Sequence, residues 1–131
     1  MVFFGEYLVS FTGAGRMVIP KKIRELLPGS QFVLTKGFDH CLNGYSQSDW
    51  QDRAKSLLSV SLIDKTQLEI RRFVFSSAVF LDVDEQGRCV VPKHLLSHAG
   101  ISEKVLIAGV GDHFEVWNPD KWSTYMQQTK T

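Results

Sequence analysis

Short apolar runs, and runs that alternate apolar with polar residues, fill the first part of the chain, and glycine or proline separates them. Alternation is typical of half-buried strands, because successive side chains of a strand point to opposite faces. Pro20 suits the first turn of a helix, and Pro28 followed by glycine ends it. Ser46, with Asp49 three positions later, marks the N-cap of a further helix. We predict strands at 6–11, 17–19, 32–36 and 41–45, and helices at 21–27 and 47–58.

The same order of elements returns in the second part of the chain at a constant offset of 72 positions, with Thr12–Lys21 falling on Asp84–Lys93. The register continues without a gap until Trp50 falls on Trp122. An offset kept over about forty residues indicates one structural unit duplicated within the chain, with sites related by pseudo-symmetry. We predict strands at 79–83, 88–91, 104–108 and 113–117, and helices at 92–99 and from 119 onward.

Between the two copies, apolar residues from Ile63 to Phe75 lie mostly at helical spacing. This segment predicts a packed helical connector rather than a loose linker. Each copy alone, with about four strands, is too small to bury both faces of its sheet. Interleaving the hairpins of the two copies would bury them, so we predict one compact α+β body with approximate two-fold symmetry. Its parts would be a first repeat at 1–60, a connector at 61–77 and a second repeat at 78–131.

The composition of the 131-residue chain is that of an ordinary globular protein, with 44% hydrophobic and 22% charged residues. No apolar run approaches the roughly 18–20 residues that span a bilayer. The N-terminus lacks the basic region and cleavage site of a signal peptide, so we expect a cytoplasmic protein without a membrane partner. Cys41 and Cys89 occupy non-equivalent repeat positions and form no Cys-x-x-Cys spacing. We therefore expect neither a disulfide framework nor a structural zinc site.

The formal net charge of +1 does not by itself indicate a nucleic-acid ligand, but the charge is unevenly distributed. Residues 12–27 contain four basic side chains against the single acid Glu25, a local charge of +3. The matching residues 84–99 contain two basic and two acidic side chains, a local charge of zero. The basic residues are Arg16, Lys21, Lys22 and Arg24 in the first copy, and Arg88 and Lys93 in the second. Charge alone would equally fit a solvated helix face.

The duplicated pattern of a turn, Gly-Arg, a short apolar strand and Val/Ile-Pro-Lys resembles the swapped-hairpin barrel of bacterial AbrB-type regulators. Two such copies in one chain, separated by helices, are similar to the MraZ family in particular, over essentially the whole chain. The diagnostic element of that family is Asp-x-x-x-Arg. The second copy matches it fully, while the first keeps the arginine and has threonine in place of the aspartate. The motif positions are Thr12, Gly15 and Arg16 in the first copy, and Asp84, Gly87 and Arg88 in the second.

The resemblance implies a fold, a ligand and an assembly. The fold class would be α+β, a duplicated AbrB-like swapped-hairpin β-barrel with short flanking helices and a pseudo-two-fold axis. Members of the family are transcriptional regulators that form homo-oligomeric rings and bind direct repeats in double-stranded DNA, ahead of the operon for cell division and cell-wall synthesis. The chain would accordingly be cytoplasmic and nucleoid-associated, with no cofactor, metal, catalytic residue or small-molecule substrate.

The basic residues have a chemistry that suits this task. An arginine just beyond a glycine turn projects from the rim of a small barrel, where its guanidinium can bind guanine O6 and N7 or a phosphate. Cations at the start of the following helix suit phosphate contacts. We therefore predict a DNA-binding set of Arg16, Lys21, Lys22, Arg24, Arg88 and Lys93. One such patch is small, so its binding would be weak and salt-sensitive, and a ring on matched repeats would add avidity.

Each motif arginine also has a structural alternative, in which it pairs with a carboxylate and holds its own turn in shape. Asp84 offers that carboxylate to Arg88, whereas Arg16 has Thr12 at the equivalent position and basic residues nearby. We therefore hypothesise that the first copy reads DNA and that the second mainly maintains structure or subunit contacts.

Other features support competing functions less well. Trp50 and Trp122 could stack on bases, although equivalent packing explains their recurrence better. His94 and His98 are four positions apart on a predicted helix, but no glutamate follows His94 and the first copy has no counterpart. We therefore expect neither a metal site nor an enzyme. The main alternative is a protein-interaction module of the AbrB fold, antitoxin-like and without sequence-specific DNA binding.

Overall fold

The computed structural model describes residues 2–13, 15–59 and 64–128. Ala14 of the first predicted turn and Ile63 of the predicted connector lie outside the described residues. The strands are β1 Glu6–Thr12, β2 Arg16–Val18, β3 Gln31–Lys36, β4 Leu42–Tyr45, β5 Val79–Asp82, β6 Arg88–Val90, β7 Lys104–Gly109 and β8 Phe114–Trp117. The helices are α1 Lys21–Arg24, α2 Gln47–Leu58, α3 Lys65–Ser77, α4 Lys93–Ala99 and α5 Pro119–Gln128, with short 3₁₀ turns at Pro28–Ser30 and Phe38–His40.

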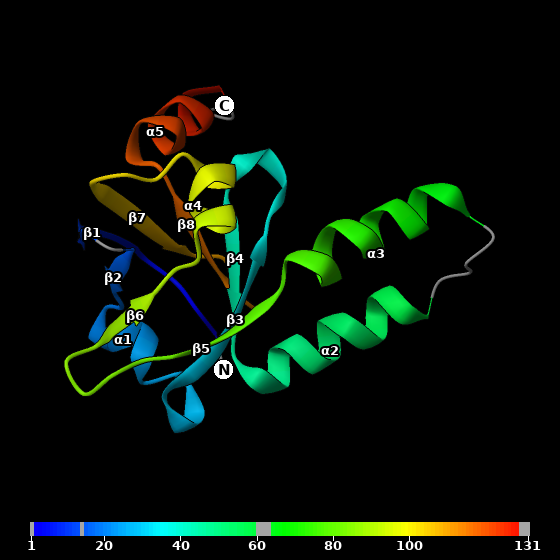
Figure 1. The fold of residues 1–131 in the computed structure, drawn as a ribbon, viewed down its shortest axis with the longest axis horizontal. Coiled ribbons are helices and arrows are strands. Elements are labelled where there is room, and N and C mark those ends of the chain that lie inside the picture. The colour runs from blue at the N-terminus through cyan, green and yellow to red at the C-terminus, as the bar shows by residue number, and fades with distance from the viewer. Residues whose placement is uncertain (1, 14, 60–63, 129–131) are drawn as a thin grey trace.

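The eight strands form one antiparallel sheet in the order β5-β3-β4-β8-β7-β1-β2-β6, which curls into a nearly closed barrel (Figure 1). Its two edge strands, β5 and β6, are consecutive in the chain, and the turn between them spans the remaining gap. In that turn the Asp84 amide donates to the Arg88 carbonyl at 2.9 Å. The predicted α+β barrel is therefore confirmed.

The two halves of the chain are interleaved throughout the sheet. Strands β1, β2, β3 and β4 pair with β7, β6, β5 and β8, respectively, so each strand of one half is hydrogen-bonded to a strand of the other. Exchanging β1 with β5, β2 with β6, β3 with β7 and β4 with β8 maps these four pairings onto one another. The structure thus confirms the predicted interleaving and the approximate two-fold symmetry.

Apolar side chains from both halves fill the barrel interior. Phe114 of β8 lies at the centre, with its ring centroid 5.5 Å from those of Phe3 and Phe32. Gly44 of β4 faces this ring, and a Cβ atom there would clash with its Cζ and Cε atoms. The duplicated unit therefore closes its core only when both copies contribute, because these rings come from different halves.

Several helix boundaries differ from the prediction, and α4 begins at Lys93 and not at Pro92. The helix predicted at 21–27 ends at Arg24, and the chain continues in tighter turns, with the Leu27 amide donating to the Arg24 carbonyl at 3.0 Å. Leu27 itself is extended, with φ −113° and ψ 92°, because the ring of Pro28 disfavours helical geometry at the preceding residue. The connector helix begins at Lys65 and extends two residues past Phe75 to Ser77.

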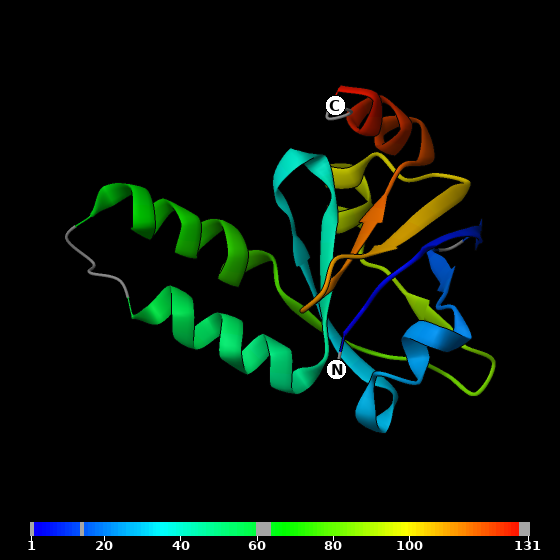
Figure 2. The same ribbon diagram turned by 180° about the vertical axis from the view of Figure 1, so that it is seen from behind.

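Helices α2 and α3 form an antiparallel hairpin that projects from the barrel, seen from both sides in Figures 1 and 2. The predicted connector is helical and packs at its base against the barrel, where the Phe73 ring lies 5.4 Å from that of Phe38 and the Lys36 amide donates to the Ser77 hydroxyl at 3.0 Å. Arg71 ties the two helices together by donating to the carbonyls of Leu57 and Leu58 at 3.3 and 3.2 Å. At the base of the hairpin, the rings of Trp50 and Phe75 are 5.7 Å apart. We call this hairpin the arm.

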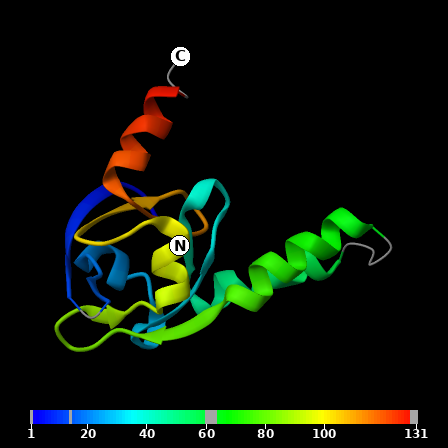
Figure 3. The ribbon, with the colours of Figure 1, turned by 45° about the horizontal axis from the view of Figure 1, so that its top comes forward.

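Helix α5 leaves the barrel in a different direction from the arm (Figure 3). Asn118 caps it, with its side-chain oxygen accepting from the amides of Asp120 and Lys121 at 2.8 and 3.2 Å. In the part of the chain that the structure describes, no helix combines the length and apolar character needed to cross a membrane.

Candidate nucleic-acid interface

Strands β2 and β6 form a short two-stranded ribbon that carries both motif arginines. Arg16 lies opposite Val90 and Val18 lies opposite Arg88. The central pair, Met17 and Cys89, points into the core and is buried. Because side chains alternate along a strand, the two arginines lie on the outer face of the ribbon, at its opposite ends.

In the second copy, Asp84 organises the turn that precedes Arg88. Its Oδ1 accepts from the amides of Gln86 and Arg88, both at 2.9 Å, and its Oδ2 lies 3.3 Å from Arg88 Nε. These contacts, led by the hydrogen bond from the Arg88 amide, lower the pKa of Asp84 below its ordinary value. The Arg88 side chain is 39% exposed, so it is anchored at Nε while part of it remains accessible. The anticipated arginine–carboxylate pair therefore exists in this copy.

The equivalent turn of the first copy is organised differently. The Thr12 hydroxyl donates to the Arg16 carbonyl at 3.5 Å, the long limit for a hydrogen bond. The Arg16 side chain is exposed, and its guanidinium has no hydrogen bond or ion pair with any described residue. The two motif arginines thus differ in their contacts, because among the described residues only the Arg88 guanidinium has a carboxylate partner.

Each end of the ribbon is built from both halves. The Ile19 amide donates to the Gly87 carbonyl at 2.7 Å, and the Val91 amide donates to the Gly15 carbonyl at 2.8 Å. Helix α1 therefore begins beside the turn of the second copy, and α4 begins beside the turn of the first. The structure does not bring Arg16 together with the cations of α1 that follow it in sequence.

Arg24 lies directly against the turn of the other half. Its Nε donates to the Ile19 carbonyl at 3.1 Å, and a Cβ atom added to Gly87 would lie 2.9 Å from its Cζ. Gly87 has a φ of +82°, so glycine suits this position for its backbone as well as for the space it leaves. The sequence gives no sign of this contact, because it joins positions 63 residues apart.

The lysines of the predicted set, Lys21, Lys22 and Lys93, are all exposed at the two ends of the ribbon. Helix α1 has only four residues, so its dipole adds little to phosphate binding. Contacts to phosphate would depend on the lysine side chains themselves.

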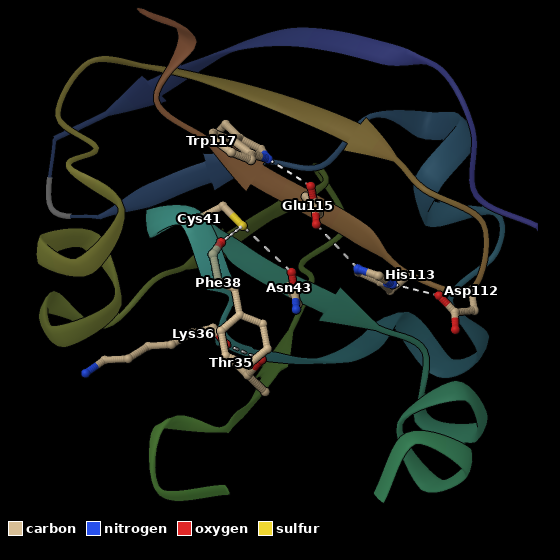
Figure 4. Close-up of polar contacts among 9 residues, drawn as sticks. All are labelled: Thr35, Lys36, Phe38, Cys41, Asn43, Asp112, His113, Glu115 and Trp117. Atoms are coloured by element: carbon tan, nitrogen blue, oxygen red, sulfur yellow. Dashed lines mark hydrogen bonds and ion pairs between the residues drawn. The ribbon is translucent and has the colours of Figure 1, made fainter. Parts of the chain in front are cut away.

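A second polar cluster, which the sequence did not indicate, lies on the outer face of β4 and β8 (Figure 4). Trp117 Nε1 donates to Glu115 Oε1 at 3.0 Å, Glu115 Oε2 lies 3.6 Å from His113 Nε2, and His113 Nδ1 lies 2.7 Å from Asp112 Oδ1. Burial alone would lower the pKa of His113, but its contacts with Glu115 and Asp112 outweigh burial and raise it. Asn43 and Tyr45 of β4 and Arg53 of α2 border the same cavity of about 270 Å³.

The two thiols, Cys41 beside this cluster and Cys89 on β6, have no sign of reactivity. Cys41 is buried and its Sγ lies 2.9 Å from the Phe38 carbonyl oxygen. Burial, helped by the charges of Glu115 and Asp39, raises the pKa of Cys41 to about 12. Burial likewise raises the pKa of Cys89 to about 12. Both thiols are therefore protonated at neutral pH and poor as nucleophiles.

The repeated tryptophans pack rather than point to open solvent. Trp50 lies 5.6 Å from Tyr45, and Trp122 lies 5.3 Å from Trp117, between ring centroids, so the same aromatic pair occurs in each half. The indole of Trp122 also donates to Glu6 at 3.2 Å. Each tryptophan joins a helix to the barrel, which accounts for its recurrence without a stacked base.

An interleaved, duplicated barrel with an arginine after each glycine turn defines the class of AbrB-like swapped-hairpin proteins. The chain belongs to the MraZ family within that class. The family model described as "MraZ protein, putative antitoxin-like" matches it twice, at residues 2–73 and 74–131.

Curated relatives match the chain over nearly its whole length. It is 42% identical to the transcriptional regulator MraZ of Acetivibrio thermocellus, in an alignment of 95% of this chain and 86% of the relative. It is also 42% identical to that of Syntrophomonas wolfei over 99% and 90%, and 36% identical to that of Ligilactobacillus salivarius over 98% and 90%. These names associate the chain with transcriptional regulators and not with enzymes.

Proposed function

We propose that this protein is a transcriptional regulator that binds specific DNA sequences through the outer face of the β2–β6 ribbon. Its target would be short direct repeats upstream of the operon for cell division and cell-wall synthesis, as the family resemblance implies. The observation that carries the proposal is the position of Arg16 and Arg88, exposed or partly exposed at opposite ends of one narrow ribbon.

The dimensions and chemistry of the ribbon suit the major groove. A groove about 12 Å wide admits a two-stranded β-ribbon, and an arginine there can bind guanine O6 and N7 with two hydrogen bonds. Lys21 and Lys22 flank one end of the ribbon and Lys93 flanks the other, so they are suited to phosphates on either side. The ribbon would therefore read bases while the lysines fix its register.

One subunit presents few cations, and the net charge is only +1. Binding by a single chain would be weak and would fall steeply with salt, because it depends on counterion release. A homo-oligomeric ring would present the ribbon repeatedly, and repeated target sites would convert several weak contacts into avidity. A regulator of this kind would act in the cytoplasm, associated with the nucleoid.

Fluorescence anisotropy with a duplex from upstream of the gene, and with a scrambled duplex, tests this proposal at two salt concentrations. We expect salt-sensitive, sequence-dependent binding that Arg16→Ala and Arg88→Ala each weaken. Lys55→Ala on α2 is the matched control, because it removes one exposed cation from the arm and should leave binding unchanged. Binding that is indifferent to sequence and to both arginines would contradict the proposal.

The description of the family model as antitoxin-like favours one other function, a module that binds a partner protein. That function would be supported if a specific partner protein co-purified with the chain. The affinities for the upstream and scrambled duplexes would then be equally low at both salt concentrations.

A further inference from the structure

The pseudo-symmetry of the ribbon ends is broken at two equivalent positions. Where the second copy has Asp84, the first has Thr12, and where α1 has Arg24, α4 has Leu96. Both differences affect the same turn, because α1 packs beside the turn of the second copy. One end of the ribbon thus acquires both the aspartate and the additional arginine, and the other end acquires neither.

The end with Asp84 is held by more contacts. Asp84 fixes the backbone amide and the Nε of Arg88, as described above, and Arg24 lies against Gly87 in the same turn. At the other end, a Cβ atom at Gly15 would lie 2.9 Å from the Val91 carbonyl oxygen and 3.7 Å from Leu96 Cδ1, so the Gly15 turn is as tightly enclosed but the position of Arg24 is taken by an apolar side chain. The guanidinium of Arg88 is therefore restrained before any ligand binds, whereas that of Arg16 is not.

Charge does not distinguish the two ends once the halves are interleaved. The Gly87 end combines Lys21, Lys22, Arg24 and Arg88 with Glu25, Asp84 and Glu85, and the Gly15 end has Arg16 and Lys93. Their formal charges are +1 and +2, unlike the +3 and zero of the consecutive segments. The two ends therefore differ in how firmly the arginine side chain is held, and little in the charge that attracts DNA.

We propose that the two arginines divide the work, with Arg88 as the base-reading residue and Arg16 as a contact to phosphate. This inference depends on the proposed DNA binding and reverses the hypothesis that the first copy reads sequence. A restrained guanidinium loses less conformational entropy on binding and tolerates only one geometry, so it discriminates between bases. A free guanidinium can reach any nearby phosphate and adds affinity without sequence dependence.

Asp84 and Arg24 act in this scheme as positioning residues. Asp84 holds Arg88 Nε, which leaves its terminal nitrogens to meet a base edge. Arg24 covers Gly87 and bonds the Ile19 carbonyl, so it braces the turn from the opposite half.

The test measures two quantities for each full-length variant: the ratio of affinities for the upstream and scrambled duplexes, and the slope of log affinity against log salt. Arg88→Ala should lower the ratio about 10- to 100-fold. Arg88→Lys should leave the salt slope unchanged and lower the affinity ratio, because lysine retains the positive charge but lacks the planar guanidinium that makes two hydrogen bonds to one base. Arg16→Ala should weaken both duplexes equally and make the slope shallower by about 1.

Substituting each of these residues by its counterpart in the other copy tests whether it positions Arg88 or only stabilises the fold. Asp84→Thr and Arg24→Leu copy the other end of the ribbon, and each should lower the ratio while leaving the slope nearly unchanged. Thr12→Asp should preserve the ratio, and thermal unfolding of every variant identifies any that fails to fold. The proposed roles of the two arginines would be overturned if Arg16→Ala abolished the preference for the upstream duplex while Arg88→Lys preserved it. Failure of the wild-type protein to prefer the upstream duplex would instead contradict the proposed function itself.

Discussion

At the scale of single residues, each polar site contains a carboxylate that contacts several neighbours. Asp84 uses one oxygen for two backbone amides and the other for Arg88, so a single side chain shapes the turn and directs the arginine. Glu115 similarly accepts from Trp117 and contacts His113 on the outer face of β8. Substitution at either carboxylate would affect several neighbours at once.

The His113 cluster predicts a pH-dependent contribution to stability. Because the folded protein raises the pKa of His113, its contribution is complete below the ordinary histidine value of about 6.5 and is lost as pH rises through the folded pKa. We expect the melting-temperature difference between wild type and His113→Gln to narrow over that interval. An NMR titration of the His113 ring checks the direction. A folded pKa below the ordinary value would contradict the prediction.

Gly87 predicts a stability cost that Gly13, in the turn of the first copy, does not share. Gly87→Ala places a side chain at a φ of +82° and crowds Arg24, so we expect a loss of about 1–2 kcal/mol in the free energy of unfolding. Gly13→Ala meets no atom within 4 Å and is the control, with an expected change within about 0.5 kcal/mol. Urea denaturation measures both, and equal losses would show that neither space nor conformation matters at Gly87.

The residues of the DNA-binding set could be identified from the repeat, but their grouping could not. Arg16 and Lys21 are five positions apart, and the sequence suggests a shared patch. Strand β2 separates them. Because β2 pairs with β6 of the other half, Lys21 lies at the end of the ribbon that carries Arg88. Contacts such as that of Arg24 with Gly87 depend on tertiary pairing, which local sequence patterns do not encode.

At the scale of secondary-structure elements, the sequence predicted those with strong local signals well. The N-cap Ser46 fixes the start of α2, where its hydroxyl oxygen accepts from the Asp49 amide at 3.2 Å, and the helix spans the predicted 47–58. Helix α1 is shorter than predicted because Pro28 acts on Leu27 and not only at its own position. The direction in which the arm projects has no local signal, since helical periodicity identifies the apolar face of a helix but not the element against which that face packs.

The arm depends on Trp50 for its junction with the barrel, which the next experiment exploits. Trp50 contacts Tyr45 on β4 and Phe75 on α3, so Trp50→Ala removes an aromatic contact shared by all three elements. We expect amide hydrogen exchange in α2 and α3 to increase at least about tenfold, corresponding to 1.4 kcal/mol or more of lost local stability. Trp122→Ala, the equivalent change in α5, should leave exchange in the arm unaltered. Global unfolding of Trp50→Ala would show that the arm is not a separate local unit.

At the scale of the whole molecule, interleaving makes the halves inseparable. The cross-half ladders β1–β7, β3–β5, β4–β8 and β2–β6 bind each half to the other along most of the sheet. The repeat in the sequence indicated such a body, because one copy could not bury its own sheet. Rings from both halves meet in that body, since Phe3 and Phe32 of the first half pack against Phe114 of the second.

Cutting the chain between its halves therefore should not separate them. We expect a protein with a protease site inserted between Ser59 and Asp64 to remain one folded particle after cleavage, and to yield two fragments only in denaturant. Size-exclusion chromatography followed by denaturing electrophoresis measures this. An uncut sample with the same insertion is the control. Fragments that elute apart under native conditions, each folded, would contradict the interleaved topology.

The pairing of β1 with β7 has a consequence for how the protein is made. Glu6 lies opposite Ala108, so the first strand meets this partner only after about a hundred further residues have been synthesised. Many proteins fold their N-terminal domain first while the ribosome extends the chain. In this protein the β1–β2 and β3–β4 hairpins of the first half can pair early, but the edge of β1 that meets β7 stays unpaired until β7 has been synthesised.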